Sequence, residues 1–476
     1  MNTIASSGST IVVTAKTGRF RRRMTMLVLA LVLLLAGGGM ALAGVFSGER
    51  GTGSGAVAVA EARLPELGEP APVLASLSED APAPDPAVLA GQLAPLLAAP
   101  VLGSGASAQV VDVATGDVLL NQGASEPVTP ASTLKLLTAV AVLTTLDPSD
   151  TLETTVVAGA TPGEVVLVGG GDPTLSRTAP SQTYPGAPTV AELAAEVAAA
   201  LPAGTPVTRV VVDSSLFSGP LTASGWGPAD APSSYAAPVT ATAVDGARVS
   251  PGSQARSGQP GLDAGSALAD ALGGRGATVV LGEAPEGTEV LATVESAPIS
   301  RLVEQMLSQS DNMLAEALAR QVALARELPA SFEGSARAVT AAVTDAGVDV
   351  TGVALADASG LSREDRAPAS VLAAVVRGAA DGSIAGASGL LSGLPVAGYD
   401  GTLVDRGDAD PATAPGTVRA KTGTLLGVHA LAGTAVTADG RLLAFAVVAD
   451  GATGSETAAE AVLDDVAAVL AGCGCR

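Results

Sequence analysis

Apolar and polar positions alternate with a helical period in three parts of the chain. Residues 134–146 carry apolar side chains at the spacing of a buried helix, and Pro130 just upstream marks its start. A second helical stretch covers residues 297–326, and the polar triplet at 310–312 near its middle predicts a loop or helix junction there. An amphipathic pattern at 456–470 predicts a closing helix. The segments before the first and before the last of these helices instead show the two-residue period of strands.

Strand-like runs flank the helices at both ends of this region. Two of them, joined by a Gly-containing turn, predict a β-hairpin before the first helix, and three more precede the closing helix. Both ends of the folded part can then meet in one antiparallel sheet, so the sequence predicts an α+β fold. The five predicted strands are residues 108–113, 118–120, 418–424, 429–436 and 442–448.

A long segment from Asp147 to Ser296 interrupts the helical pattern. It contains short Thr- and Val-rich runs at 153–157, 164–168 and 207–212, separated by Gly and Pro, which predict small β elements. We therefore predict an inserted, mostly β domain. The inserted domain is residues 147–296, and the main domain is residues 87–146 together with 297–470, followed by a tail at 471–476.

The N-terminal part is predicted to lie outside this fold. A basic lead of residues 1–23 precedes an uncharged run at 24–46 that is long enough to cross a bilayer. Ala41-Leu42-Ala43 resembles a signal-peptidase site, so a membrane anchor and a cleaved signal both remain open. Residues 47–86 are rich in Gly, Ala, Ser and Pro and predict a disordered linker. In either case we expect the bulk of the chain to be extracytoplasmic.

Composition excludes several kinds of partner and site. The 476 residues include 25 Lys and Arg against 47 Asp and Glu, and a net charge of −22 argues against nucleic-acid binding. Cys473 and Cys475 stand at the extreme C-terminus and cannot form a four-ligand metal cluster. We expect neither a metal nor a cofactor.

Only three lysines occur in the chain, and two of them complete short motifs. Lys135 closes Ser132-Thr133-Leu134-Lys135, and Lys421 opens Lys421-Thr422-Gly423. Ser310-Asp311-Asn312 lies between them. Each triplet is weak alone, as a further Lys-Thr-Gly at 16–18 shows, but the three in this order are the signature of penicillin-recognising serine enzymes.

The motif residues can divide the work of acyl transfer. Ser132 is the candidate nucleophile, and Lys135 lies one helical turn away as its base, which requires a pKa lowered by burial and by Lys421. The sole histidine, His429, has no G-x-S-x-G motif beside it, so we interpret it as structural. Ser310 can relay the proton to the leaving nitrogen.

Substrate binding is assigned to the remaining motif positions. Asn312 can hold a substrate backbone, while Lys421 and Thr422 offer a cation and a hydroxyl for a carboxylate. Gly423 would let the substrate strand approach closely. We expect the backbone amides of Ser132 and Thr424 to stabilise the oxyanion.

At these residues the chain resembles the class C, low-molecular-mass penicillin-binding proteins, the D-alanyl-D-alanine carboxypeptidase and endopeptidase family. The resemblance implies a serine β-lactamase/transpeptidase-like domain that acts on peptidoglycan stem peptides and is acylated by β-lactams. It also implies that the 178 positions from Ser132 to Ser310 hold an insertion. The further matching segments are 130–138, 169–175, 213–217, 357–362, 394–398 and 400–403.

Three alternatives remain beside a carboxypeptidase with possible endopeptidase activity. A class A β-lactamase shares the triplets but needs a Glu-x-x-Leu-Asn segment, which the sequence lacks. A penicillin-binding sensor or a wall-binding scaffold would keep the motifs without turnover. For the inserted domain, the hypothesis is a separately folding unit that guides the substrate without taking part in bond cleavage.

Overall fold

The computed structural model describes residues 81–406 and 416–474. These residues belong to one compact unit, Leu74–Arg476. The predicted basic lead, membrane segment and most of the predicted linker, together with the Lys-Thr-Gly at 16–18, lie outside the described residues. Within the described part, no helix has the length and apolar character needed to cross a membrane.

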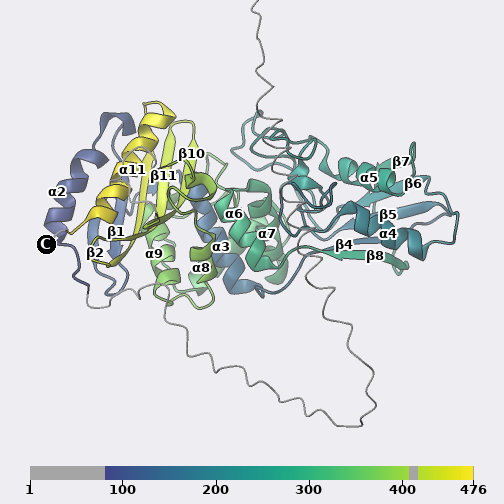
Figure 1. The fold of residues 1–476 in the computed structure, drawn as a ribbon, viewed down its shortest axis with the longest axis horizontal. Coiled ribbons are helices and arrows are strands. Elements are labelled where there is room, and N and C mark those ends of the chain that lie inside the picture. The colour runs from purple at the N-terminus through teal and green to yellow at the C-terminus, as the bar shows by residue number, and fades with distance from the viewer. Residues whose placement is uncertain (1–80, 407–415, 475–476) are drawn as a thin grey trace, which may run out of the picture. The chain divides into compact units, whose positions relative to one another are not determined.

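The main domain is built on a five-stranded antiparallel sheet. Its order is β10-β11-β12-β1-β2, so the early strands join the late ones through the pair β1 and β12, where Val110 lies opposite Phe445. Figure 1 shows the yellow C-terminal strands beside the purple N-terminal hairpin. The predicted α+β fold is confirmed. The strands are β1 (Ser107–Asp112), β2 (Val118–Gln122), β10 (Val418–Leu425), β11 (Val428–Val436) and β12 (Leu442–Asp450).

Two helices cover one face of this sheet. The closing helix α11 (Glu456–Gly472) was predicted, whereas α2 (Pro86–Leu97) was not. Helix α2 begins inside the segment predicted as linker, with the Asp85 carboxylate accepting hydrogen bonds from the first turn and proline at its start. Its Leu89, Leu93 and Leu97 recur every four residues and are fully buried with α11 against the sheet. The helix thus begins at the last residue of the segment predicted as linker, and the linker itself stays a prediction.

A helical layer covers the other face and carries the largest core. Helix α9 packs directly on β12, β1 and β11, and the other helices pack behind it. The stretch predicted at 297–326 forms two helices, α6 and α7, and the chain turns at 309–311, where a junction was expected. The layer contains α3 (Lys135–Thr145), α6 (Ile299–Ser308), α7 (Asn312–Ala325), α8 (Phe332–Asp345), α9 (Ala369–Ala380) and α10 (Gly389–Gly393).

The inserted segment contains a second five-stranded sheet with its own apolar core. Its order is β7-β6-β5-β4-β8, and β5, β6 and β7 run parallel. Parallel neighbours need crossover connections, and α4 (Val190–Ala200) and α5 (Pro260–Ala271) supply them. The sequence pattern did not predict these two helices. The strands are β4 (Glu153–Ala158), β5 (Glu164–Gly169), β6 (Arg209–Asp213), β7 (Thr278–Leu281) and β8 (Val290–Glu295).

Residues 214–257 of the same segment lie outside that sheet and pack on the main domain. Ala236 and Val239 share a cluster with Met313 and Phe332, and the ring of Trp226 meets Phe332 edge-on at 5.4 Å. The division at 147 and 296 stays a prediction. The short elements are η1 (Pro100–Leu102), β3 (Pro127–Val128), η2 (Ala131–Leu134), η3 (Asp245–Ala247), β9 (Ala367–Pro368), which pairs with β3, and η4 (Gly401–Leu403).

Candidate active site

Ser132 lies in the tight turn that leads into helix α3. The turn is the 3-10 element η2, and the α-helix begins at Lys135. Ala131 before the serine is left-handed, with φ 48°. Gly360 packs against this turn so closely that a Cβ at position 360 would lie 1.9 Å from the Ala131 carbonyl oxygen. Only glycine fits there, so Gly360 fixes the turn that presents the nucleophile.

Lys135 is fully buried and directly contacts Ser132. Its Nζ lies 3.0 Å from the Ser132 Oγ, 2.5 Å from the Asn312 Oδ1 and 2.6 Å from the Ser359 carbonyl oxygen. These three acceptors match the three donors of an ammonium group. The structure thus brings together the first two motifs as the sequence spacing predicts.

Burial lowers the pKa of Lys135 to about 8. Four buried carboxylates partly offset this effect, in the order Asp357, Asp311, Glu316 and Asp365. At neutral pH a pKa near 8 leaves a minority of neutral amine, which is the form that can accept a proton from a serine hydroxyl. The electrostatics therefore suit Lys135 to the role of base.

The Ser310-Asp311-Asn312 triplet forms the junction between α6 and α7. Ser310 has φ 55°, a left-handed conformation that costs a non-glycine residue about 1 kcal/mol or more. Asn312 begins α7 and donates from Nδ2 to the Tyr235 carbonyl oxygen at 3.2 Å. Ser132, Ser310 and Asn312 all line one cavity, so the predicted cluster of motif residues exists in space.

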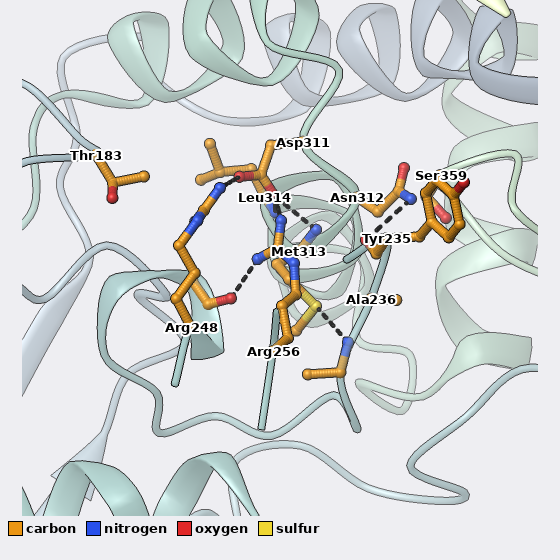
Figure 2. Close-up of polar contacts among 12 residues, drawn as sticks. Thr183, Tyr235, Ala236, Arg248, Arg256, Asp311, Asn312, Met313, Leu314 and Ser359 are labelled. Carbon is orange, nitrogen blue, oxygen red and sulfur yellow. Dashed lines mark hydrogen bonds and ion pairs between the residues drawn. The ribbon is translucent and has the colours of Figure 1, made fainter. Parts of the chain in front are cut away.

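Asp311 lines the same cavity and belongs to a buried polar cluster. Its carboxylate caps α7 and also accepts a hydrogen bond from the Tyr184 hydroxyl at 2.7 Å. Burial alone would raise the pKa of this carboxyl, but Arg256 and Arg248 hold it below its usual value. Figure 2 shows both guanidinium groups reaching toward Asp311.

The third motif lies on β10, and its lysine is buried. Lys421 is fully buried and donates to the Thr422 carbonyl oxygen at 2.9 Å, while Thr422 and Thr424 line the cavity. Burial and then the charge of Lys135 put the pKa of Lys421 well below its usual value. Burial is the main cause of the lowered pKa of Lys135. The expected contribution of Lys421 to that shift stays a prediction.

Gly423 has close neighbours within the protein, and the expected close approach of a substrate strand stays a prediction. A Cβ at position 423 would lie 3.0 Å from the Pro130 carbonyl oxygen and 3.2 Å from the Cβ of Ala131. Glycine at 423 thus lets β10 pack against the turn that carries Ser132. Its small size serves the protein's own packing here.

The cavity has a volume of about 1000 Å³, and part of its wall comes from the inserted segment. The inserted segment thus lines the site, and its predicted role in guiding the substrate without contributing to bond cleavage stays a prediction. The loops between its strands fold back onto α7, which its β-like pattern did not indicate. The contributing residues are Thr183, Tyr184, Asp230, Ser234, Tyr235, Arg248, Gln254 and Arg256.

His429 lies in β11 opposite Thr424 and is buried in the cavity wall. Among the described residues the hydrogen-bond partner of the Ser132 hydroxyl is Lys135, and no bond joins it to His429. Burial lowers the pKa of His429. The described residues also include no group of three His, Cys, Asp or Glu side chains arranged to hold a metal ion.

Sequence reasoning missed the acidic cluster beneath Lys135. Asp357 accepts from the backbone amides of Gly360 and Ser362, at 2.7 and 2.8 Å, and so shapes the loop that holds the Ala131 turn. Glu316 accepts from the Ala358 amide at 3.0 Å. The segment 357–362 was recognised as family-like, yet nothing in its sequence showed that it lies beside Lys135.

Comparison with known proteins identifies relatives along almost the whole described chain. The model of the "D-Ala-D-Ala carboxypeptidase 3 (S13) family" matches residues 89–260 and 252–471. The chain is 42% identical over 446 residues to carboxypeptidase DacB of Mycolicibacterium smegmatis, covering 92% of this chain and 94% of that protein. It is 40% identical over 410 residues to carboxypeptidase Rv3627c of Mycobacterium tuberculosis, covering 84% and 87%.

Solved structures show the same fold. Penicillin binding protein 4 (dacB) from Haemophilus influenzae superposes with a TM-score of 0.66 at 23% identity, covering 81% of this chain and 98% of that one. The same protein complexed with a β-lactam superposes with a TM-score of 0.61 at 22% identity, covering 80% and 98%.

Proposed function

The chain belongs to the D-Ala-D-Ala carboxypeptidase 3 (S13) family and is a serine-type D-Ala-D-Ala carboxypeptidase, and from this premise we propose that its reaction runs through an acyl-enzyme on Ser132. The observation that supports this assignment most directly is the 3.0 Å contact between the Ser132 Oγ and the Nζ of a fully buried Lys135. Peptidoglycan stem peptides are the substrate, and β-lactams acylate the same serine.

In the first half-reaction neutral Lys135 takes the proton of the Ser132 hydroxyl. The Oγ forms a bond to the carbonyl carbon of the penultimate D-Ala, and the peptide C–N bond breaks. The leaving amine of the terminal D-Ala receives that proton from Lys135 through Ser310, which lines the cavity with Ser132, so Lys135 is neutral again. Water then attacks the ester, Lys135 again serving as base, and the shortened peptide leaves with Ser132 restored.

The developing oxyanion and the substrate carboxylate need separate donors. The backbone amides of Ser132 and Thr424 serve the oxyanion, since both residues line the cavity. Thr422 and Thr424 line the cavity, and the Thr422 hydroxyl takes the terminal carboxylate next to the buried Lys421. The Asn312 carboxamide accepts a hydrogen bond from Lys135, and Asn312 also lines the cavity that receives the substrate.

Endopeptidase activity is a second reaction of the same acyl-enzyme. The cavity of about 1000 Å³ lies at the upper end of the range for ligand pockets and is larger than a D-Ala-D-Ala end requires. That room supports a cross-linked stem peptide as an additional substrate. No finding favours the β-lactamase, sensor or scaffold alternatives.

Product analysis tests the proposed function. The purified protein is incubated with an uncross-linked pentapeptide muropeptide and with a cross-linked dimer, and the products are identified by mass. Loss of one D-Ala from the pentapeptide is expected, and conversion of dimer to monomers would show endopeptidase activity. If neither substrate changes while the protein is folded, the proposed function is wrong; a Ser132→Ala variant controls for contaminating peptidases.

We further propose that the enzyme lies on the extracytoplasmic side of the membrane, held by residues 24–46. The support is the basic lead before an uncharged run of spanning length, and a substrate found outside the membrane. The N-terminal mass of protein from washed membranes tests this location. Protein that begins after position 43 would show a cleaved signal, and recovery in the cytoplasmic fraction would contradict the proposal.

A further inference from the structure

We propose that Tyr184, Arg248 and Arg256 of the inserted segment are positioning residues for acyl transfer, which hold Asp311 and thereby place Ser310 and Asn312. This inference rests on the proposed function, because it assigns a role in the reaction of Ser132. It gives part of the insertion a place in catalysis rather than in substrate guidance alone.

Asp311 is held from both sides of its carboxylate. Oδ1 accepts from the Met313 amide at 2.8 Å and lies 3.5 Å from the Arg256 Nη2, while Oδ2 accepts from the Tyr184 hydroxyl at 2.7 Å and lies 3.9 Å from the Arg248 Nη2. The Asp311 side chain is only 3% exposed. In such a network a buried carboxylate has one arrangement in which both of its oxygens accept hydrogen bonds.

The three donors are themselves fixed by a turn of the inserted segment. Asp245, Gly246 and Ala247 are all left-handed, with φ of 51°, 64° and 64°. Arg248 donates from Nη1 to the Asp245 carbonyl oxygen at 2.9 Å, and Arg256 donates from Nη1 to the Gly246 carbonyl oxygen. The turn therefore presents two carbonyl groups that aim both guanidinium groups at Asp311.

Glycine at position 246 makes this cluster possible. A Cβ there would lie 2.0 Å from the Tyr184 hydroxyl and 2.7 and 2.8 Å from the Nη1 atoms of Arg248 and Arg256. Arg248 also donates to the Tyr184 hydroxyl at 3.1 Å, and its guanidinium carbon lies 5.6 Å from the centre of that ring. The three side chains form one connected unit around the hydroxyl of Tyr184.

The residues on either side of Asp311 carry the chemistry. Ser310 is left-handed, a conformation that persists only where its surroundings fix it, and Asp311 is its immediate neighbour. Asn312 accepts from the Lys135 Nζ at 2.5 Å through its Oδ1. A small movement of Asp311 would thus shift Ser310 and loosen the contact between Asn312 and Lys135, and misplacement of reacting groups lowers rates steeply.

Tyr184→Phe is the sharpest test, because it removes one hydroxyl and leaves the ring in the core. Acylation by a fluorescent penicillin is followed over a range of drug concentrations, which separates the rate constant of acylation from the dissociation constant of the first complex. We expect the rate constant to fall about tenfold, with the dissociation constant changed less than about twofold. Tyr399→Phe is the matched control, since Tyr399 is 77% exposed.

Arg256→Gln should lower the acylation rate constant about thirtyfold, and Arg256→Lys should recover part of it because the charge beside Asp311 remains. Arg209→Gln is the control: Arg209 pairs with Glu164 in the insertion's sheet, at 3.1 Å. If Arg256→Gln does not fold, Tyr184→Phe decides.

Acylation rate constants within twofold of wild type in folded Tyr184→Phe and Arg256→Gln would overturn the inference. An equal fall in rate and affinity, with no recovery in Arg256→Lys, would also overturn it, since that pattern indicates general damage to the cleft. Failure of the wild-type protein itself to be acylated would count against the proposed function instead.

Discussion

The rate of acylation should rise with pH because the base is a buried lysine. Lys135 must be neutral to take the proton of Ser132, and burial lowers its pKa to about 8. An exposed lysine, with a pKa near 10.4, would be almost entirely protonated at neutral pH. The perturbation is therefore a change of pH through the pKa of Lys135, with the sequence left intact.

The magnitude follows from the fraction of neutral amine. With a pKa of about 8, about a tenth of the molecules carry neutral Lys135 at pH 7 and about nine-tenths at pH 9. The sign is positive, because deprotonation creates the active form. We expect the acylation rate constant to rise about tenfold from pH 7 to pH 9, with a midpoint near pH 8.

Single-turnover acylation by saturating fluorescent penicillin, between pH 6 and 9.5, measures this directly. Saturation isolates the chemical step from binding, and circular dichroism at each pH confirms that the protein stays folded. Lys135→Arg supplies the companion measurement, since a guanidinium stays charged and cannot act as a base. That variant should acylate at less than about a hundredth of the wild-type rate at every pH.

A rate constant that is flat from pH 6 to 9, or that falls as the pH rises, would refute the assignment of Lys135 as base. A rate constant that still rises about tenfold per pH unit at pH 9.5 would instead show that burial does not lower the pKa of Lys135 in solution. A slow Lys135→Arg variant that kept the wild-type pH profile would also refute it, because the titrating group would then lie elsewhere.

Two further substitutions test the packing around the site. Gly360→Ala should lower the free energy of unfolding by about 3 kcal/mol and slow acylation, because the new Cβ would overlap the Ala131 carbonyl. Gly347→Ala is the control, with φ 86° and open space around it, and should lower the free energy of unfolding by about 1 kcal/mol. Equal losses for the two variants in urea unfolding would contradict this. Glu316→Gln should lower the free energy of unfolding by about 3 kcal/mol, because it leaves the buried Arg320, 3.1 Å away, without its charged partner. The double variant Glu316→Gln with Arg320→Met should lose less stability. A double variant less stable than the single one would show that the pair is not coupled.

The core of the candidate site could be predicted from local sequence. Ser132 and Lys135 are three positions apart, so a helical turn must bring them together, and the junction at Ser310 follows from a polar triplet inside an apolar helical pattern. Such predictions succeed because the interacting residues are close in sequence or the motif dictates its own backbone. The antiparallel sheet was equally predictable, since its strands are bounded by clear turns.

The contacts that complete the site could not be predicted in this way. Tyr184 and Arg256 reach Asp311 across 127 and 55 positions, and they belong to loops with no regular period. The complete burial of Lys421 depends on the elements packed against β10, which no spacing reveals. Helix α4 is a different kind of miss, because Thr189 and Glu192 form a capping box that was readable in the sequence.

The central claim is that Ser132 is the nucleophile of this carboxypeptidase, and mapping the penicillin adduct tests it most directly. Wild-type protein and Ser132→Ala are incubated with penicillin, digested, and analysed by mass for the modified peptide. The account predicts an adduct of the drug's mass on Ser132 in the wild type and no adduct in the variant. A stable adduct on the Ser132→Ala protein, or on another residue of the wild type, would contradict the account.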